Sequence, residues 1–481
     1  MQKLNEICSC ESKANSETEF VGIRCEKTKE GGVLETNIIF PLGYFKDDSA
    51  LRELPEEELR ECVVNLFMVL SDPSLQEQIH QDSSISTFAE EHGESEFPMV
   101  SYLNVIRNFL DFGYLDEKEI LYKKGANGKI SWGRTIKAVR PVITENEQNL
   151  VYLDFIARKV SYNEDTLITQ VHKFCVHDAL VKLGFLFGIE PFEEPLLDFD
   201  YDLFCNAIHS KLAKTFNDRD LRLLADLARI VEYLAGHRTE DGKTADDFYF
   251  GVNKFAPVWE AMVDKIFGKL PQGVAKDKFN PHCEWDLSSG ARGYENPNYA
   301  MRPDTIMWDE EGNRLYVLDA KYYKFGMTGS AADLPSSGSI CKQIAYAEYV
   351  ETHWKTILGV DSIATPSASL QNDTLPKPIY NAFLLPYCFD ADNSQLPPDD
   401  GFETRPCKMR FIGFCHGNWK NLDAMPGEVD FRPYHRIAGI LLDVRSVMEN
   451  YGAFGEAQKT LAELLPIKYI ERQEEFLAPS L

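Results

Sequence analysis

The sequence is poor in positive charge. Among its 481 residues, 50 are Lys or Arg and 76 are Asp or Glu, which gives a formal net charge of −26 at pH 7. Proteins hold DNA largely through Lys and Arg that neutralise phosphates, so the overall field of this chain opposes DNA binding. Charges are screened over roughly 8 Å in physiological salt, so a local basic cleft is still compatible with this balance. If the chain acts on DNA, we expect it to depend on a partner subunit for affinity.

Long apolar runs are also missing. No stretch approaches the length of a membrane span, and residues 1–12 lack the hydrophobic region of a secretion signal. The eleven cysteines are scattered and odd in number, as expected of reduced thiols in the cytoplasm. Cys8, Cys10 and Cys25 have no second pair or histidine that would complete a metal site. These absences favour a cytoplasmic protein with no membrane contact.

The length predicts more than one hydrophobic core. Residues 189–200 are acidic and interrupted by proline, and a polar loop follows residue 237. We therefore predict an amino-terminal region over residues 1–190, a helical connector over 191–250 and a carboxyl-terminal domain over 251–481. Apolar periodicity predicts helices near residues 55–70, 99–112, 166–187, 201–215 and 218–236.

One of the few basic patches lies between residues 120 and 140. This stretch is predicted to form a hairpin with an exposed tip, and its basic residues are Lys123, Lys124, Lys129, Arg134, Lys137 and Arg140. Trp132 and Arg134 are residue types that often anchor interfaces. The patch is either a solvated hairpin or a contact surface for nucleic acid or a partner protein, and the sequence leaves both open.

The most informative stretch is Arg302 to Lys324. Two short apolar runs flank a turn-forming segment, so we predict a β-hairpin. Asp304 lies on the first strand and Asp319 on the second, with Lys321 two residues further. Side chains two apart on a strand point to the same face, so Asp319 and Lys321 should lie together and pairing can bring Asp304 beside them. Two carboxylates and a lysine can hold a divalent metal ion and activate a water.

Helices and strands are predicted on both sides of this hairpin. A helix over residues 257–267 carries Glu260 at the edge of its apolar stripe, and a helix over 339–352 carries Gln343. The Gly- and Ser-rich stretch 326–338 is expected to be mobile. Strands are predicted at 378–385 and 409–415, residues 437–442 fit either a strand or a helix start, and a helix is predicted near 454–465. The alternation predicts an α/β fold, with a helix-flanked sheet in the carboxyl-terminal half and an α+β amino-terminal region.

These residues carry a resemblance. Glu260, Pro303-Asp304, Asp319-Ala320-Lys321 and Gln343 resemble the pattern of the PD-(D/E)xK nuclease superfamily. More specifically, the chain resembles the LlaJI restriction endonuclease family, which is similar to the McrC nuclease subunit of McrBC-type systems. The resemblance implies a restriction-endonuclease-like mixed sheet and Mg²⁺-dependent cleavage of double-stranded DNA. It also implies metal ligation by Asp304, Asp319 and Glu260, with Lys321 and Gln343 as further catalytic residues.

The resemblance extends to the amino-terminal half. The segments Ile39 to Gly43 and Trp132 to Lys137 look like the family's amino-terminal region. This implies that the amino-terminal half docks on a McrB-like AAA+ GTPase, with Trp132 and Arg134 as candidate contacts, and that the system serves antiviral defence. Two alternatives remain: a type II restriction endonuclease that acts alone, and a non-catalytic activator of the GTPase. Dimerisation is one way in which both DNA strands could be cut.

Overall fold

The computed structural model describes residues 8–12, 20–27, 34–75, 97–115, 117–125, 128–143, 150–163, 166–192, 194–237, 247–288, 292–294, 301–312, 314–358, 379–389, 402, 407–420, 432–452 and 455–477. The chain forms two compact units. Residues 95–248 form most of one, and residues 4–94 together with 249–481 form the other. These limits differ from the predicted boundaries at 190 and 250, because the first ninety residues pack with the carboxyl-terminal part.

The larger unit is built on a mixed five-stranded sheet in the order β12-β13-β14-β16-β15. β12 and β13 are antiparallel, β13, β14 and β16 run parallel, and β15 is antiparallel to β16. The strands are β12 (Thr305–Asp309), β13 (Arg314–Ala320), β14 (Ile379–Tyr387), β15 (Met409–His416) and β16 (Arg436–Asp443). Every residue of β14 is buried, as expected for a central strand covered on both faces. The predicted α/β fold with a mixed sheet is confirmed.

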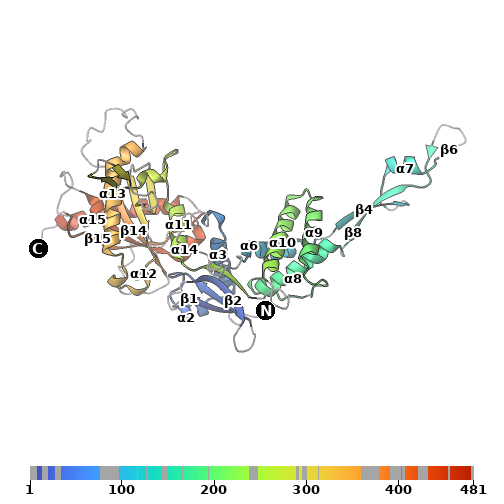
Figure 1. Ribbon diagram of the computed structural model, residues 1–481, viewed down its shortest axis with the longest axis horizontal. Coiled ribbons are helices and arrows are strands. Elements are labelled where there is room, and N and C mark those ends of the chain that lie inside the picture. The colour runs from blue at the N-terminus through green and yellow to red at the C-terminus, as the bar shows by residue number, and fades with distance from the viewer. Residues whose placement is uncertain are drawn as a thin grey trace. The chain divides into compact units, whose positions relative to one another are not determined.

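Helices cover both faces of this sheet (Figure 1). They are α11 (Ala256–Phe267), α12 (Phe325–Thr328), α13 (Ser337–Leu358), α14 (Val444–Asn450) and α15 (Glu456–Leu477). On one face, Val317 packs with Ala347 and Val350 of α13 in a buried cluster. On the other face, Tyr380 stacks on Tyr316 and meets the edge of Tyr469 from α15. Because successive residues of a strand point to opposite faces, residues 315, 317 and 319 all face α13.

Two predictions in this unit need correction. The stretch 326–338, expected to be mobile, contains most of α12 and a short 3₁₀ turn at Ala331–Asp333, which Thr328 Oγ1 holds by a 2.6 Å bond to Asp333 Oδ2. The last helix is longer than predicted, because Pro466 lies inside α15 without ending it. The strand or helix predicted at 437–442 is a strand that leads directly into α14.

The amino-terminal part of the larger unit contributes a second sheet. It contains β1 (Cys8–Ser12), β2 (Val21–Lys27), β3 (Leu34–Phe40) and β9 (Phe248–Val252), in the order β1-β3-β2-β9. α2 (Asp48–Glu53) and α3 (Glu56–Leu70) follow, the second as predicted. Because β9 comes just before α11 in the sequence, this sheet connects the amino-terminal residues with the second half of the chain.

The other unit combines a helical bundle with a β-ribbon. Its helices are α6 (Met99–Phe112), α8 (Leu167–Phe187), α9 (Tyr201–Leu212) and α10 (Asp218–Gly236), close to the predicted ranges. β4 (Glu117–Lys124) and β8 (Ile156–Asn163) form a ribbon that extends from the bundle (Figure 1). At its far end lie β5 (Lys129–Ile130), α7 (Trp132–Ala138), β6 (Val142–Ile143) and β7 (Leu150–Val151).

The hairpin predicted at residues 120–139 is therefore wrong. β4 pairs along its length with β8, a partner more than thirty residues away, and β5 also pairs with β8. The second half of the predicted hairpin is helix α7. The alternation of apolar and polar residues correctly predicted strand-forming residues here. The strands with which they pair depend on contacts between distant parts of the sequence.

Helix α8 carries a histidine in the core of its unit, His172. His172 is fully buried, and its Nδ1 accepts the Leu115 N–H at 2.9 Å. Burial lowers the pKa of His172 from 6.5 to about 4, so the ring is neutral at pH 7.

Within the described ranges, no helix combines the length and apolar character needed to cross a membrane.

Candidate active site

The hairpin β12–β13 brings the two predicted aspartates together. Thr305 pairs with Leu318, so Asp304, just before β12, lies next to Asp319 and Ala320 at the end of β13. The Ala320 N–H donates to Asp304 Oδ2 at 2.9 Å. The chain then continues the parallel ladder, with the Lys321 N–H donating to Leu384 O of β14 at 2.9 Å. Regular strand pairing thus fixes both acidic positions and the lysine at one edge of the sheet.

Lys321 lies between the two carboxylates. Its Nζ is 2.7 Å from Asp319 Oδ2 and 3.9 Å from Asp304 Oδ2. Asp319 is 5% exposed, whereas Asp304 and Lys321 are partly exposed. Buried charges are costly unless they are paired. Removing the lysine or either aspartate would therefore leave the remaining charges less well compensated.

The local electrostatics show an excess of negative charge. Burial, followed by the charges of Asp319 and Glu260, raises the pKa of Asp304 well above its usual value, and Lys321 opposes this. Burial alone would lower the pKa of Lys321, but the charges of Asp304 and Asp319 outweigh it and raise that pKa. Glu260 reaches this cluster from α11, where it is half-buried. The structure therefore brings Asp304, Asp319, Lys321 and Glu260 within electrostatic reach of one another.

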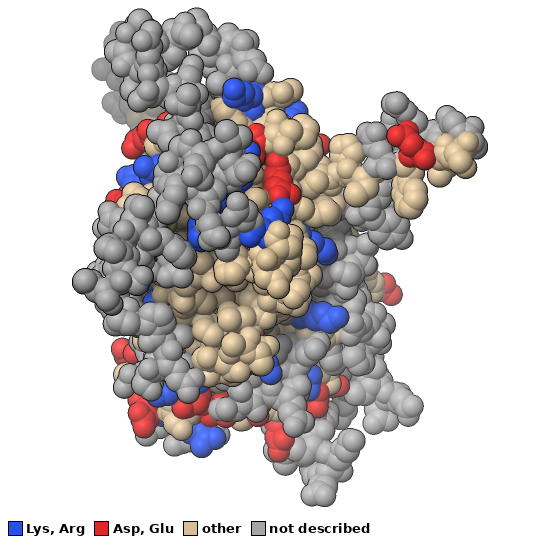
Figure 2. Space-filling view, turned by 90° about the vertical axis from the view of Figure 1, so that its left-hand side faces the viewer, with Lys and Arg blue, Asp and Glu red and all other residues tan. Residues whose placement is uncertain are grey.

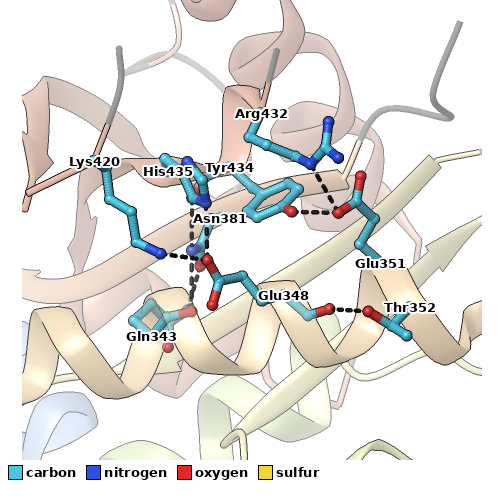
Figure 3. Close-up of polar contacts among 9 residues, drawn as sticks. All are labelled: Gln343, Glu348, Glu351, Thr352, Asn381, Lys420, Arg432, Tyr434 and His435. Atoms are coloured by element: carbon cyan, nitrogen blue, oxygen red, sulfur yellow. Dashed lines mark hydrogen bonds and ion pairs between the residues drawn. The ribbon is translucent and has the colours of Figure 1, made fainter. Parts of the chain in front are cut away.

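Gln343 lies elsewhere. Its side chain is fully buried between α13 and the sheet, and its Nε2 donates to Val317 O at 3.0 Å and to Asn381 Oδ1 at 2.6 Å. Figure 3 shows Gln343 and Asn381 side by side beneath the 3₁₀ turn that carries Tyr434. Its amide hydrogens are thus directed to the protein core, and its catalytic role stays a prediction.

Two further residues belong to the surroundings of the carboxylates. Burial and the charges of Asp319 and Asp304 raise the pKa of Tyr346 to about 12. Lys276 donates to the main-chain oxygen of Asp304 and pairs with Asp264 at 2.8 Å. Tyr346 could have been found from its spacing of three from Gln343 on one helix face. Nothing in the local sequence marks Lys276.

The donor set fits Mg²⁺ as a partial site. Over the described ranges, no cluster of three or more His, Cys, Asp or Glu side chains is arranged to hold a metal ion. Mg²⁺ is commonly bound by only one or two carboxylates, with water and substrate phosphates completing the shell. Asp304 and Asp319 supply such carboxylates, and burial together with the charges of Asp319 and Glu260 raises the pKa of Asp304. Glu260 is the third acidic side chain close enough to add to that charge.

The candidate contact residues Trp132 and Arg134 lie on α7 in the other unit. Trp132 is 52% exposed and rests edge-on against Phe155. The Arg134 guanidinium lies 3.9 Å from the centre of the Tyr122 ring. Exposed apolar side chains continue around them, at Ile136, Val142, Ile143, Leu150 and Leu153. We call this set of residues the ribbon tip.

Comparisons with known proteins place the chain in a family. It is 24% identical over 248 residues to the type II restriction enzyme BsuMI component YdjA of Bacillus subtilis (strain 168), an alignment covering 50% of this chain and 51% of that protein. The chain thus matches about half the length of this curated relative. A half-complex of Thermococcus gammatolerans McrB AAA+ hexamers with bound McrC aligns over 93% of this chain and 83% of that chain, at 12% identity. Its TM-score of 0.32 is below the level that indicates a shared fold. The sequence model of the LlaJI restriction endonuclease matches residues 39–394, most of the chain. This chain belongs to the LlaJI restriction endonuclease family.

Proposed function

We propose that this chain is a Mg²⁺-dependent DNA endonuclease, the cleavage subunit of a McrBC-like restriction system that works with an AAA+ GTPase. The observation that carries the proposal is the convergence of Asp304, Asp319 and Lys321 at the end of β13. Phosphodiester hydrolysis builds negative charge on phosphoryl oxygens and expels an alkoxide, so it needs fixed positive charge at that place. Family membership supports the same reaction.

The chain's own residues have distinct parts in this proposal. Asp304 and Asp319, with Glu260 nearby, would hold Mg²⁺, which neutralises phosphoryl charge and lowers the pKa of a bound water. Lys321 is charged at pH 7, because its pKa is raised. An ammonium so placed would orient a water or stabilise charge on the phosphate. The Ala320 N–H fixes the Asp304 carboxylate by a hydrogen bond to Oδ2.

Acidity supports the need for a partner. On the face shown in Figure 2, the Lys and Arg side chains of the described residues are dispersed among apolar and acidic ones and form no continuous basic surface. Such a surface gives little counterion release on DNA binding, so affinity must come largely from elsewhere. The ribbon tip, with half-exposed Trp132 and neighbouring basic residues, has the composition of an interface anchor.

Cleavage assays test the catalytic part of the proposal. Purified protein is incubated with plasmid and Mg²⁺, with and without the candidate GTPase and GTP, as wild type and as Asp304→Ala and Lys321→Ala. We expect cutting only in the complete wild-type mixture and a loss of about a hundredfold or more in each variant, because each removes a group acting on transition-state charge. Glu310→Ala, in the exposed turn of the same hairpin, is the matched control and should cut normally. Cleavage that survives Asp304→Ala would falsify the assignment of the site.

Binding assays test the ribbon tip. The double change Trp132→Ala with Arg134→Ala should weaken association with the GTPase by at least about tenfold, the effect expected of interface anchors. Phe216→Ala changes a side chain of the same unit that is 91% exposed, and serves as the control. Association is measured by sedimentation or light scattering, and unchanged binding by the double variant contradicts docking through the tip.

A stand-alone type II endonuclease is the second candidate. The type II reaction class is that of the curated relative, which is described as a component of a type II restriction enzyme. Site-specific cutting by the wild-type chain without GTP or partner, lost in Asp304→Ala, would decide for this alternative.

A further inference from the structure

Helix α13 presents two polar side chains to the hairpin that carries the candidate site. Gln343 and Tyr346 are three residues apart, so they lie on the same helix face. Gln343 is fully buried and Tyr346 is 5% exposed. Buried polar side chains on an apolar helix face need a reason, because they must be hydrogen-bonded to be tolerated.

Gln343 holds the second strand. Its Nε2 donates to Val317 O at 3.0 Å, two residues before Asp319. Asn381 of β14 holds the same side chain, because its Oδ1 accepts from Gln343 Nε2 at 2.6 Å. The Asn381 Nδ2 also donates to the main-chain oxygen of Gln343 at 3.1 Å. A reciprocal pair of this kind leaves the Gln343 side chain little freedom to turn.

Tyr346 holds the first strand. Its hydroxyl accepts the main-chain N–H of Arg302, two residues before Asp304. Both arms of the hairpin are therefore bonded to one helix, and each bond lies two residues before one of the two acidic positions. A single rigid element thus touches the two main-chain segments whose separation determines how far apart the carboxylates lie.

The helix itself is tied down on a further side. Glu348 accepts from His435 Nε2 at 3.0 Å and also pairs with Lys420. Glu351 pairs with Arg432 Nε at 3.0 Å and accepts from the Tyr434 hydroxyl. Figure 3 shows these groups reaching toward Glu348 and Glu351 across the surface of α13. Tyr434 O in turn accepts from Asn381 Nδ2 at 3.1 Å, which closes the network onto the buried amides.

We propose that α13 sets the separation of Asp304 and Asp319, with Gln343 and Tyr346 as positioning residues that bond the main chain ahead of each aspartate. The proposal deepens the nuclease assignment and rests on it for the catalytic role of the aspartates, whereas the positioning itself does not depend on that assignment. Metal and catalytic sites require geometry within about half an ångström, which side chains at a strand end achieve only if their main chain is fixed.

Amide hydrogen exchange of the full chain tests the positioning without metal or DNA. The variants are Tyr346→Phe, which removes one hydroxyl, and the double change Gln343→Leu with Asn381→Leu, which leaves neither amide unpaired. We expect the amides of Arg302, Asp304 and residues 317–320 to exchange at least about fivefold faster, the effect of one lost hydrogen bond. Tyr349→Phe on the same helix, whose ring stacks on His353, is the control and should leave these amides unchanged.

Two results would overturn the proposal. One is exchange of these amides at the wild-type rate in both variants. The other is acceleration spread equally over β14 and β16, which shows general loosening of the sheet. A Mg²⁺ titration of cleavage adds a second readout: a several-fold rise in half-saturating Mg²⁺ for Tyr346→Phe supports positioning, and an unchanged value opposes it. Absence of any cleavage by the wild-type complex refutes the proposed function and leaves the exchange result as the test of α13.

Discussion

At the scale of single residues, the like charges around Asp304 destabilise the folded chain. Three acidic side chains act on one another in a partly buried place, and Lys321 offsets part of their charge. Such clusters are retained where function needs them, because titratable groups perturbed by burial and by like charges are concentrated at functional sites. The buried Asp178–Lys182 pair of α8 differs from this cluster, because its two opposite charges compensate each other. The Tyr102 hydroxyl donates a further hydrogen bond to Asp178.

His172 gives a prediction at this scale. Its pKa is lowered to about 4 in the folded chain, against 6.5 when exposed. The unfolded chain therefore binds more protons between these values, so stability is full above pH 6.5 and is lost as the pH falls toward 4. The difference corresponds to about 3 kcal/mol in the free energy of unfolding. Urea unfolding at pH 7 and pH 5 measures the effect.

The variant His172→Gln should flatten this dependence, because glutamine can still accept the Leu115 N–H and does not titrate. His177→Gln on the same helix is the control and should keep the wild-type slope. Equal slopes for wild type and His172→Gln would show that another group causes the acid sensitivity.

At the scale of elements, the segment after β3 contacts the residues that follow strand β13. The Leu42 N–H donates to the Tyr322 hydroxyl at 2.5 Å, next in sequence to Lys321. Gly43 has a φ of +84°, and a Cβ there would lie 3.0 Å from Val444 Cγ2 and 3.3 Å from Tyr387 N. A segment far from the hairpin in sequence thus packs against the ends of β14 and α14 and against the residue that follows Lys321.

Gly43→Ala should therefore destabilise the larger unit by about 1–3 kcal/mol, the cost of a strained left-handed backbone with close neighbours. Gly452→Ala is the matched control, because a Cβ there meets nothing within 4 Å. Thermal unfolding of both variants checks the prediction. A Gly43→Ala protein as stable as Gly452→Ala would show that the segment can shift away from β14.

At the scale of the whole molecule, one unit is inserted in the sequence of the other. Residues 95–248 separate two parts of the larger unit, whose amino-terminal sheet includes β9 from beyond the insertion. Phe40 and Phe67 of the amino-terminal part are fully buried. Removing that part would expose its contacts on the remaining chain and leave β9 without β2.

We expect a fragment of residues 97–248 to unfold cooperatively and a fragment of residues 249–481 to lack a cooperative transition. The first keeps a complete set of helices, whereas the second loses strands and helices that complete its core. Circular dichroism during heating distinguishes the two. A cooperative transition in 249–481 at the temperature of the full chain would show that its core is independent of residues 4–94.

The sequence by itself determined the local elements and the chemistry of the hairpin. Helices such as α6 and α8 and the strands of the hairpin follow from apolar periodicity and turn residues. Asp304, Asp319 and Lys321 came together as predicted because alternation along a strand and antiparallel pairing are short-range rules. The LlaJI family model matches residues 39–394, a range that includes this hairpin.

Only the tertiary structure decided which distant segments meet. The pairing of β4 with β8, the inclusion of residues 4–94 in the larger unit and the burial of Gln343 all depend on contacts between residues far apart in the chain. Local periodicity carries no information on such partners, because many segments of suitable pattern compete for each edge and face. The local sequence around a helix glutamine is the same whether its side chain faces a reacting phosphate or, as here, the carbonyl of Val317.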